Sequence, residues 1–492
     1  MNIQLSTQSA LETDVPCLVV PVWQNADISG VAEEINEKMN GLVTEVFGDG
    51  FKGAAGETRV LYAGDAVGAS RVMLCGWGVE EKLTAAAVRR IAAKAARGVR
   101  SIKRASFAFV VPETRLPAET VARAVVEGIE LGLHVCHEYK TAEDSKPFEV
   151  ESATLIGLPE SVQGDIAAAQ IEANANIKAR AWVNRPSNLK SPIYLAERAQ
   201  LIADERGLQC EVWDENRIQA ERMGALWGVG MGSANPPRFI RLDYTPAGTE
   251  NDAPIILVGK GMSYDTGGYS LKPSTSMEDM KDDMGGAAAV LGAMDAIAAL
   301  QIPKRVIMLV PSAENMVSGN AQRVGDIVTA RNGKTIEVLN TDAEGRLILA
   351  DALSYASELN PRCIIDFATL TGAISIALGQ EAAGLFANDD ELASAVTQAG
   401  ETSGERVWQF PMWDEYKDHV KGTISDLKNL GTERRAGSIA AAVFLENFVA
   451  SGIPWAHVDI AAVAFVRENR PLVQRGATGY GVRLAVELVR NI

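Results

Sequence analysis

Short apolar runs alternate with segments of helical spacing along almost the whole chain, and this alternation limits the fold more than any other feature. In the first third, residues 58–64, 71–78 and 105–112 are typical of buried strands, because each is a short run of mostly apolar residues. Residues 84–101 and 117–134 repeat apolar side chains at helical spacing. Strands and helices in this order predict an α/β fold, in which helices flank a parallel or mixed sheet.

The second half of the chain shows the alternation more strongly. Its predicted strands are 253–261, 305–315, 335–340, 363–372 and 456–465. A chain of 492 residues exceeds one ordinary core, so we expect two domains. A long helical pattern over 164–184 ends at the loop RPSNLKSP. We therefore expect a small N-terminal α/β domain over 1–163, a linking helix over 164–184, and a larger C-terminal α/β domain over 185–492 with a mixed, mostly parallel sheet.

The composition is typical of a globular protein of the cytoplasm. The formal net charge is −16, which disfavours nucleic acid as a partner because an acidic chain is repelled by phosphates. The five cysteines are scattered, without a CxxC pair, which indicates reduced thiols. No basic region precedes the first apolar run and no apolar stretch is long enough to cross a bilayer, so we expect neither a signal peptide nor a membrane partner.

Polar residues follow the predicted strands of the second half. They are Lys260, Glu314, Asp342 with Glu344, and Thr369 with Thr371. In an open α/β sheet, ligands bind at the carboxyl ends of the strands, so we expect these side chains to face a common site. The stretch 276–294 adds acids to this set, and its methionines and leucine fall at helical spacing. We expect a helix there, with its acids in the first two turns.

Four carboxylates of these segments would balance two divalent cations. They are Asp265, Asp283, Asp342 and Glu344. Like charges that lie so close together cannot all stay ionised without compensation. The chain has four histidines, none of them in these segments, so an oxygen-rich site suits Mg²⁺ or Mn²⁺, and also Zn²⁺ if Lys260 or Lys272 supplies a nitrogen. The alternative is structural, since acids also stabilise the first turns of helices.

A series of motifs in the second half resembles the leucyl aminopeptidase family, metallopeptidase family M17. In chain order the motifs are VNRPSN (183–188), GKG followed by D-x-GG-x-SLKP (259–273), KDDMGGAAAVL (281–291), ENMVSGNA (314–321), NGKTIEVLNTDAEGRL (332–347), DFATLTGA (366–373), GSIAAAVFL (437–445), HVDIA (457–461) and GATGYGVR (476–483). The resemblance covers most of 180–492, and its eight-residue signature NTDAEGRL is highly specific. Over the first domain the resemblance is limited to the overall length and to the alternation of predicted strands and helices.

The resemblance implies a metal-dependent aminopeptidase that prefers leucine and other apolar N-terminal residues. It implies two metal ions, Zn²⁺ or Mn²⁺ with Mg²⁺ or Co²⁺ as alternatives, held by Lys260, Asp265, Asp283, Asp342 and Glu344. Asp265 and Glu344 would bridge the ions. Lys272 and Arg346 would be catalytic, Lys272 toward the developing oxyanion and Arg346 by holding a bicarbonate that acts as general base. The partners implied are peptide substrates and further copies of the chain in a homohexamer.

The family's substrate-binding positions map onto six residues here. They are Met280, Asn340, Thr369, Gly372, Ala461 and Ala464. Some relatives have methionine where this chain has Ala464, so we hypothesise a larger pocket floor that tolerates residues bigger than leucine. Two other departures, the sequence MSYDT around Asp265 and Val324 in place of a proline, do not change a predicted ligand.

Two alternatives differ in class from a peptidase. The first is a two-metal hydrolase such as a phosphoesterase, although such enzymes usually recruit histidines. The second is an additional, non-enzymatic role in DNA binding, which some relatives have and which the net charge of −16 disfavours here.

Overall fold

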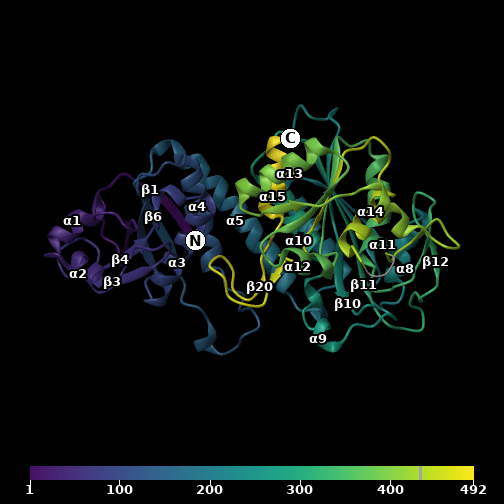
Figure 1. Cartoon of the computed structure of the whole chain (residues 1–492), viewed down its shortest axis with the longest axis horizontal. Coiled ribbons are helices and arrows are strands. Elements are labelled where there is room, and N and C mark those ends of the chain that lie inside the picture. Colours follow the sequence, from purple (N-terminus) through teal and green to yellow (C-terminus); the bar gives the residue numbers. More distant parts are fainter. Residues whose placement is uncertain (432–434) are drawn as a thin grey trace. The chain divides into compact units, whose positions relative to one another are not determined.

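The computed structural model describes residues 1–431 and 435–492, which form two compact units of α/β type (Figure 1). The first unit comprises Met1–Asn174 with Glu468–Arg475, and the second comprises Ala175–Arg467 with Gly476–Ile492. The predicted two-domain α/β fold is confirmed. Over the described residues, no helix is both long enough and apolar enough to cross a membrane.

The first unit is built on one six-stranded sheet. In spatial order its strands are β1 (Asn2–Ser6), β6 (Ser152–Ile156), β5 (Ser106–Val110), β2 (Leu18–Val22), β4 (Arg71–Gly76) and β3 (Thr58–Tyr62). All neighbours are parallel except β3 and β4. The helices are α1 (Val31–Lys38), α2 (Leu42–Gly48), α3 (Ala85–Ser101) and α4 (Ala118–Leu133). The patterns over 84–101 and 117–134 therefore predicted α3 and α4, whereas β1, β6, α1 and α2 were not predicted.

Strand alternation explains why this sheet is covered on both faces. Leu18 and Val20 of β2 pack in a core that includes residues of α1 and α2. Val19, which points to the opposite face, packs with residues of α3 and α4. A strand buried on both faces is apolar throughout, as LVVPV is.

Helix α5 (Gln163–Asn184) matches the pattern that predicted a linking helix over 164–184. The division between the two units falls within this helix, between Asn174 and Ala175. The short segment Glu468–Arg475 groups with the first unit, although it lies inside the predicted range 185–492.

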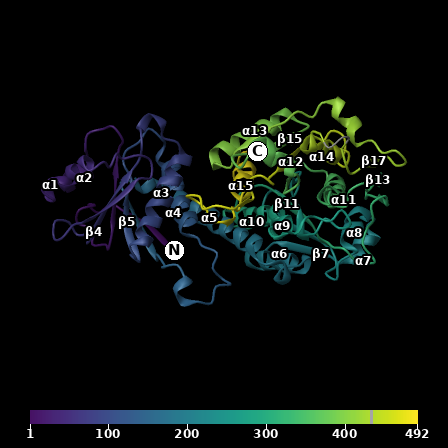
Figure 2. The same ribbon diagram turned by 60° about the horizontal axis from the view of Figure 1, so that its bottom comes forward.

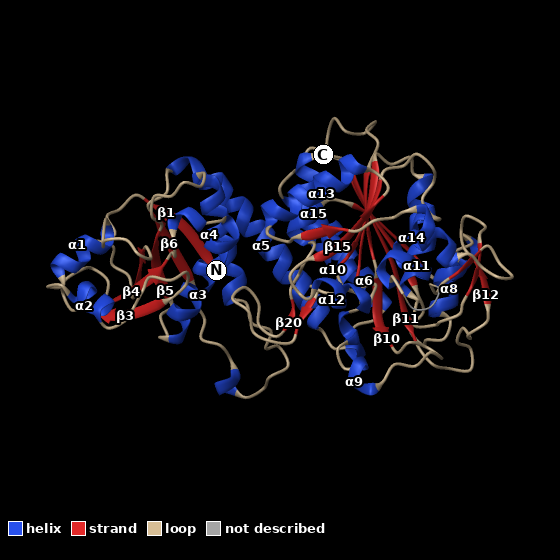
Figure 3. Cartoon of the chain, viewed as in Figure 1, coloured by secondary structure: helices blue, strands red, loops and turns tan. Residues whose placement is uncertain are grey.

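The second unit contains a nine-stranded mixed sheet (Figure 3). Its main path runs β16 (Val407–Gln409), β15 (Ala383–Ala387), β18 (Trp455–Asp459), β14 (Cys363–Ala368), β9 (Ile255–Gly259), β11 (Val306–Asn315), β8 (Arg238–Tyr244) and β7 (Gln209–Trp213). A further strand, β10 (Gly261–Asp265), pairs in parallel with β11. The central strands β18, β14, β9 and β11 are parallel, so their carboxyl ends reach the same edge.

Helices cover both faces of this sheet (Figure 2). On one face α10 (Gly285–Ala299) packs against β9 and β14, beside α6 (Pro192–Arg206) and α15 (Val482–Asn491). On the other face α11 (Gly345–Glu358) packs against the same strands, beside α8 (Gly224–Gly230) and α14 (Gly437–Glu446).

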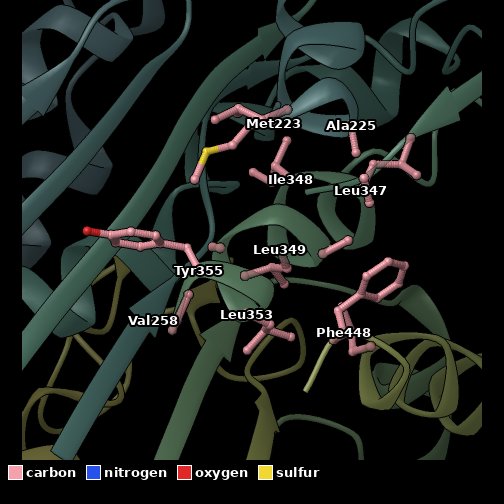
Figure 4. Close-up of a cluster of buried hydrophobic side chains, with 14 of the residues drawn as sticks. Met223, Ala225, Val258, Leu347, Ile348, Leu349, Leu353, Tyr355 and Phe448 are labelled. Carbon is pink, nitrogen blue, oxygen red and sulfur yellow. The ribbon is translucent and has the colours of Figure 1, made fainter. Parts of the chain in front are cut away.

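The hydrophobic core beneath α11 fixes the position of this helix on the sheet. Leu347, Ile348, Leu349 and Leu353 of α11 are fully buried in a cluster with Val258 of β9 (Figure 4). The same cluster also contains Met223, Ala225 and Phe448. Because this packing fixes the helix on the sheet, it also fixes the position of Glu344, which directly precedes the first residue of the helix.

Two sequence predictions in this unit were wrong in part. The strand predicted over 335–340 is β13 (Thr335–Glu337), and it belongs to a separate sheet with β12 (Ile327–Thr329) and β17 (Leu427–Lys428). Asp342 and Glu344 thus do not follow a strand of the main sheet. They reach its carboxyl edge because α11, which starts directly after them, packs on β9, β11 and β14.

The helix expected over 276–294 is interrupted. The structure has a short helix α9 (Ser274–Met277), a 3-10 turn η5 (Met280–Asp282) and then α10, so Asp279, Asp282 and Asp283 precede α10 instead of occupying its first turns. At the start of α10 a Cβ on Gly286 would lie only 2.0 Å from the carbonyl oxygen of Phe367, so glycine allows the helix to approach β14 closely. The helix start is fitted against β14 at that point.

Candidate metal centre

Three of the four predicted carboxylates meet at the carboxyl edge of the main sheet. Asp265 ends β10, while Asp342 and Glu344 lie in the turn before α11. One carboxylate oxygen from each of the three lies within 4.8 Å of the others. This spacing lets one ion contact oxygens of all three residues.

Lys260 connects the fourth carboxylate, Asp283, to this group. It directly follows β9, and its Nζ lies 2.7 Å from Oδ1 of Asp283 and 2.9 Å from Oε1 of Glu344. Thr369, at the end of β14, donates its hydroxyl to the same Asp283 oxygen at 2.8 Å. All five predicted ligands are thus brought together, with the nitrogen of Lys260 between two carboxylates.

Lys272 lies on the other side of the group. Its Nζ is 2.7 Å from Oδ2 of Asp265 and also contacts Oδ1 of Asp342. Asp265 is held in place by Asn315, whose Nδ2 donates to Oδ1 at 2.8 Å, and by the main-chain N–H of Gly267 at 2.9 Å. The carboxylates are therefore oriented by surrounding donors, as ligands in metal sites are.

Burial and neighbouring charges shift the pKa values of the whole group. Burial raises the pKa of Asp265 to about 6, with Glu344 adding to the effect. Burial also raises the pKa of Asp283 well above its usual range, and that of Asp342 to a smaller extent. Glu344 differs, because Lys260 and Lys272 outweigh its burial and hold its pKa below the usual value. Both lysines have a raised pKa, burial notwithstanding, because carboxylates surround them.

The residues present fit divalent cations. When fully ionised, the four carboxylates carry −4, and Lys260 and Lys272 in their charged forms supply +2, so −2 is left, the charge that one divalent ion balances. A Lys260 amine that binds a metal is neutral, which would leave −3. Among the described residues, the buried atoms Oδ2 of Asp283 and Oε2 of Glu344 have no hydrogen-bond partner. Buried carboxylate oxygens without donors are costly, so these two atoms are available as ligands for a cation.

Arg346 lies beside this group, in the first turn of α11, where helix N-terminal N–H groups favour anions. Its Nη1 donates to the carbonyl oxygen of Asn429 at 3.0 Å, and its buried Nε has no hydrogen-bond partner in the described part of the chain. Burial lowers its pKa to about 10, against the opposing effect of Glu344 and Asp459. A buried guanidinium with a free N–H can hold a small anion.

A cavity of about 770 Å³ opens onto the group. All five predicted metal ligands line it, as do Lys272 and four of the predicted substrate-binding residues, Met280, Thr369, Gly372 and Ala461. Ala464 and Asn340 are not among the lining residues. Ala464 lies near Thr369 and Gly285. A Cβ built on Gly285 would be 3.3 Å from Cβ of Ala464 and 3.2 Å from Cγ2 of Thr369. Oδ1 of Asn340 accepts a hydrogen bond from the N–H of Asp342 at 2.9 Å. Asn340 thus stabilises the turn that carries this ligand.

Several polar residues around the centre were missed by sequence reasoning. Asn315 orients Asp265, and Asn429 contacts the turn before α11. Lys190 is buried, and its Nζ donates to the carbonyl oxygens of Val183 at 3.0 Å and Lys281 at 2.5 Å, next to Asp282 and Asp283. Asn315 stands in the motif ENMVSGNA and could have been found there, whereas Asn429 and Lys190 carry no local signal.

Comparison with known proteins places both parts of the chain in one family. The model described as "Cytosol aminopeptidase family, catalytic domain" matches residues 177–486. The model of the N-terminal domain of the same family matches residues 19–143.

Full-length relatives and solved structures agree with these matches. A probable cytosol aminopeptidase of Syntrophotalea carbinolica is 44% identical, with 100% of each chain covered. One from Aquifex aeolicus is 43% identical, covering 90% of this chain and 89% of its own. Among solved structures, a variant of tomato leucine aminopeptidase matches with a TM-score of 0.91 at 33% identity, covering 100% of this chain and 97% of that one. The bottromycin maturation enzyme BotP in complex with Mn matches with a TM-score of 0.87 at 34% identity, covering 97% and 99%.

Proposed function

Since the chain belongs to the cytosol aminopeptidase family and is therefore a peptidase, we propose that it removes N-terminal residues, leucine and other apolar residues preferentially, by a two-metal mechanism. The observation that carries the proposal is the carboxylate group of Asp265, Asp342 and Glu344, gathered at the base of a cavity and short of positive charge. Mn²⁺ and Zn²⁺ are the cations we propose, and the complex of BotP with Mn supports the first of them.

The ligands of the two ions would be Lys260, Asp265, Asp283, Asp342 and Glu344. When bound, the ions supply four positive charges, which polarise a peptide carbonyl and make water nucleophilic at neutral pH. The chain itself contributes orientation, since Asn315, Gly267 and Thr369 fix the carboxylates through hydrogen bonds. Preorganised groups of this kind need little rearrangement during the reaction.

Two further cations of the chain would act on the substrate. Lys272 lines the cavity and is held by two carboxylates, which favours its charged form. We assign to it the stabilisation of the oxyanion that develops at the peptide carbonyl. Arg346 would hold a bicarbonate, and this anion supplies a general base when bound. The buried Nε of Arg346 supports this assignment because it has no protein acceptor among the described residues.

The proposed function is tested by hydrolysis of leucine p-nitroanilide with added Mn²⁺, with an aryl phosphate as the substrate of the alternative class. We expect anilide hydrolysis that a chelator abolishes and Mn²⁺ restores, because in the proposed mechanism the ions make water nucleophilic at neutral pH. The phosphate should not be turned over. Anilide hydrolysis that survives complete removal of metal would refute the two-metal mechanism.

Ala464 gives a prediction about substrate preference. Ala464 lies near Thr369, which lines the cavity, so the longer side chain of Ala464→Met should reduce the space beside this part of the cavity. We expect the ratio of kcat/KM for phenylalanine and leucine p-nitroanilide to fall about tenfold, the scale of one or two methylenes in an apolar pocket. Identical ratios in wild type and variant would dismiss a role for Ala464 in the pocket.

Assembly and location remain predictions. We propose a homohexamer in the cytoplasm that acts on peptides and binds neither membranes nor, at a net charge of −16, nucleic acid. Sedimentation measures the assembly, and a salt-sensitive shift of DNA on a gel would contradict the last point.

A further inference from the structure

Asn429 is fully buried and makes hydrogen bonds along the whole turn that carries the metal ligands. Its Oδ1 accepts from the N–H of Leu339 at 2.8 Å and from that of Asn340 at 3.2 Å. Its Nδ2 donates to the carbonyl oxygen of Asn340 at 2.6 Å and to that of Ala343 at 3.4 Å. Its own carbonyl oxygen accepts from Arg346 at 3.0 Å. One residue thus contacts this turn both before and after Asp342.

We propose that Asn429 is a positioning residue for the metal centre, which sets the places of Asp342, Glu344 and Arg346. The amide suits this role because it offers an acceptor and two donors on one rigid group. It pairs with the main chain of residues 339–343 much as a neighbouring strand would. An aspartate in its place would lack the donors to the carbonyl oxygens of Asn340 and Ala343.

Asn429 can hold the turn because it is itself fixed. Its N–H donates to the carbonyl oxygen of Glu337 at 3.0 Å, directly after the pairing of β17 with β13. The buried carboxylate of Glu337 accepts from the N–H groups of Thr423 and Ile424, both at 2.5 Å, and of Ser425 at 3.0 Å. The pairing of β13 with β17, together with the hydrogen bonds of Glu337, therefore holds Asn429 beside the ligand turn.

This inference rests on the proposed two-metal function, and its test separates the two. Mn²⁺ binding is measured by calorimetry, and leucine p-nitroanilide hydrolysis across a range of Mn²⁺ concentrations, for wild type, Asn429→Ala and Asn429→Asp. The matched control is Asn388→Ala, because the Asn388 amide also donates to one main-chain carbonyl, of Ile453 at 3.1 Å, and accepts from one N–H, of Trp455 at 2.7 Å, away from the centre.

We expect both Asn429 variants to bind Mn²⁺ about 10- to 100-fold more weakly than wild type, the usual effect of losing a group that orients metal ligands. Raising the Mn²⁺ concentration should recover a large part of their activity. A loss of kcat that remains at saturating Mn²⁺ would indicate that Arg346 is displaced. Asn388→Ala should bind Mn²⁺ as wild type does. Aspartate keeps the size of the side chain, so it provides a folded variant if alanine does not.

Unchanged Mn²⁺ affinity and kcat in folded Asn429 variants would overturn the inference. Failure of both variants to fold would also overturn it, because Asn429 would then serve the whole domain and not the centre. If wild type itself binds no Mn²⁺, the proposed function fails first, and this outcome is distinct from the other two.

Discussion

Replacing Glu344 by alanine is expected to lower kcat/KM for leucine p-nitroanilide by at least about a thousandfold at any Mn²⁺ concentration. Glu344 is buried, its Oε1 lies 2.9 Å from Lys260, and its Oε2 has no protein donor in the described chain. It therefore has an oxygen for each of two ions, which is what a bridging ligand requires. Alanine removes both oxygens, and it also leaves the ammonium of Lys260 in the centre with Asp283 as its remaining close carboxylate.

A control for this variant lies on the same helix. Glu358, at the other end of α11, is half exposed and paired with Arg331 at 2.9 Å. Glu358→Ala should keep wild-type kcat/KM, because Glu358 is not part of the lining of the cavity. Metal content measured on the same samples should drop for Glu344→Ala alone. Full activity of Glu344→Ala would exclude the carboxylate group as the reacting centre.

Lys272→Met is expected to lower kcat about 10²- to 10³-fold while KM changes only a few fold, because a charge aimed at the developing oxyanion acts mainly in the transition state. The methionine keeps the apolar stem of the side chain and removes the ammonium that contacts Asp265 and Asp342. Mn²⁺ should still bind to this variant, since removal of a positive charge leaves the carboxylates more negative. Loss of kcat with metal retained thus distinguishes Lys272 from a ligand.

The matched control for Lys272 is Lys178. It also pairs with two carboxylates, Asp295 at 2.8 Å and Glu205 at 3.6 Å, but it lies on α5 and is not part of the lining of the cavity. Lys178→Met should leave kcat and KM unchanged. If Lys272→Met instead raises KM with kcat intact, the lysine binds substrate and the oxyanion assignment is wrong.

Local sequence signals predicted the candidate centre better than its surroundings. Asp265, Asp283, Asp342 and Glu344 stand in short charged motifs, and the rule that ligands bind where parallel strands end correctly brought Lys260 and Thr369 to one edge. The rule failed for Asp342 and Glu344, whose preceding strand β13 belongs to another sheet. Packing of α11 brings them to the edge, and such packing is a tertiary effect that periodicity does not encode.

The sequence did not predict the features that depend on contacts between distant segments. Residues 276–294 have helical periodicity, yet α10 begins only at Gly285, where Gly286 lies close against Phe367 of β14. Asn429 and Lys190 act on segments about 90 residues away in the chain, at Asn340 and Lys281. No window of sequence around either residue contains its partner. Buried polar residues of this kind become interpretable only when the neighbouring segments are in place.

The central claim is that two divalent ions lie among these carboxylates, and anomalous X-ray diffraction from crystals grown with Mn²⁺ tests it most directly. We expect two peaks per chain, each about 2 to 2.5 Å from oxygens of at least two of Asp265, Asp342 and Glu344. One of them should also touch Asp283 or Lys260. Crystals of catalytically active protein with no peak in contact with any of these side chains would contradict the account.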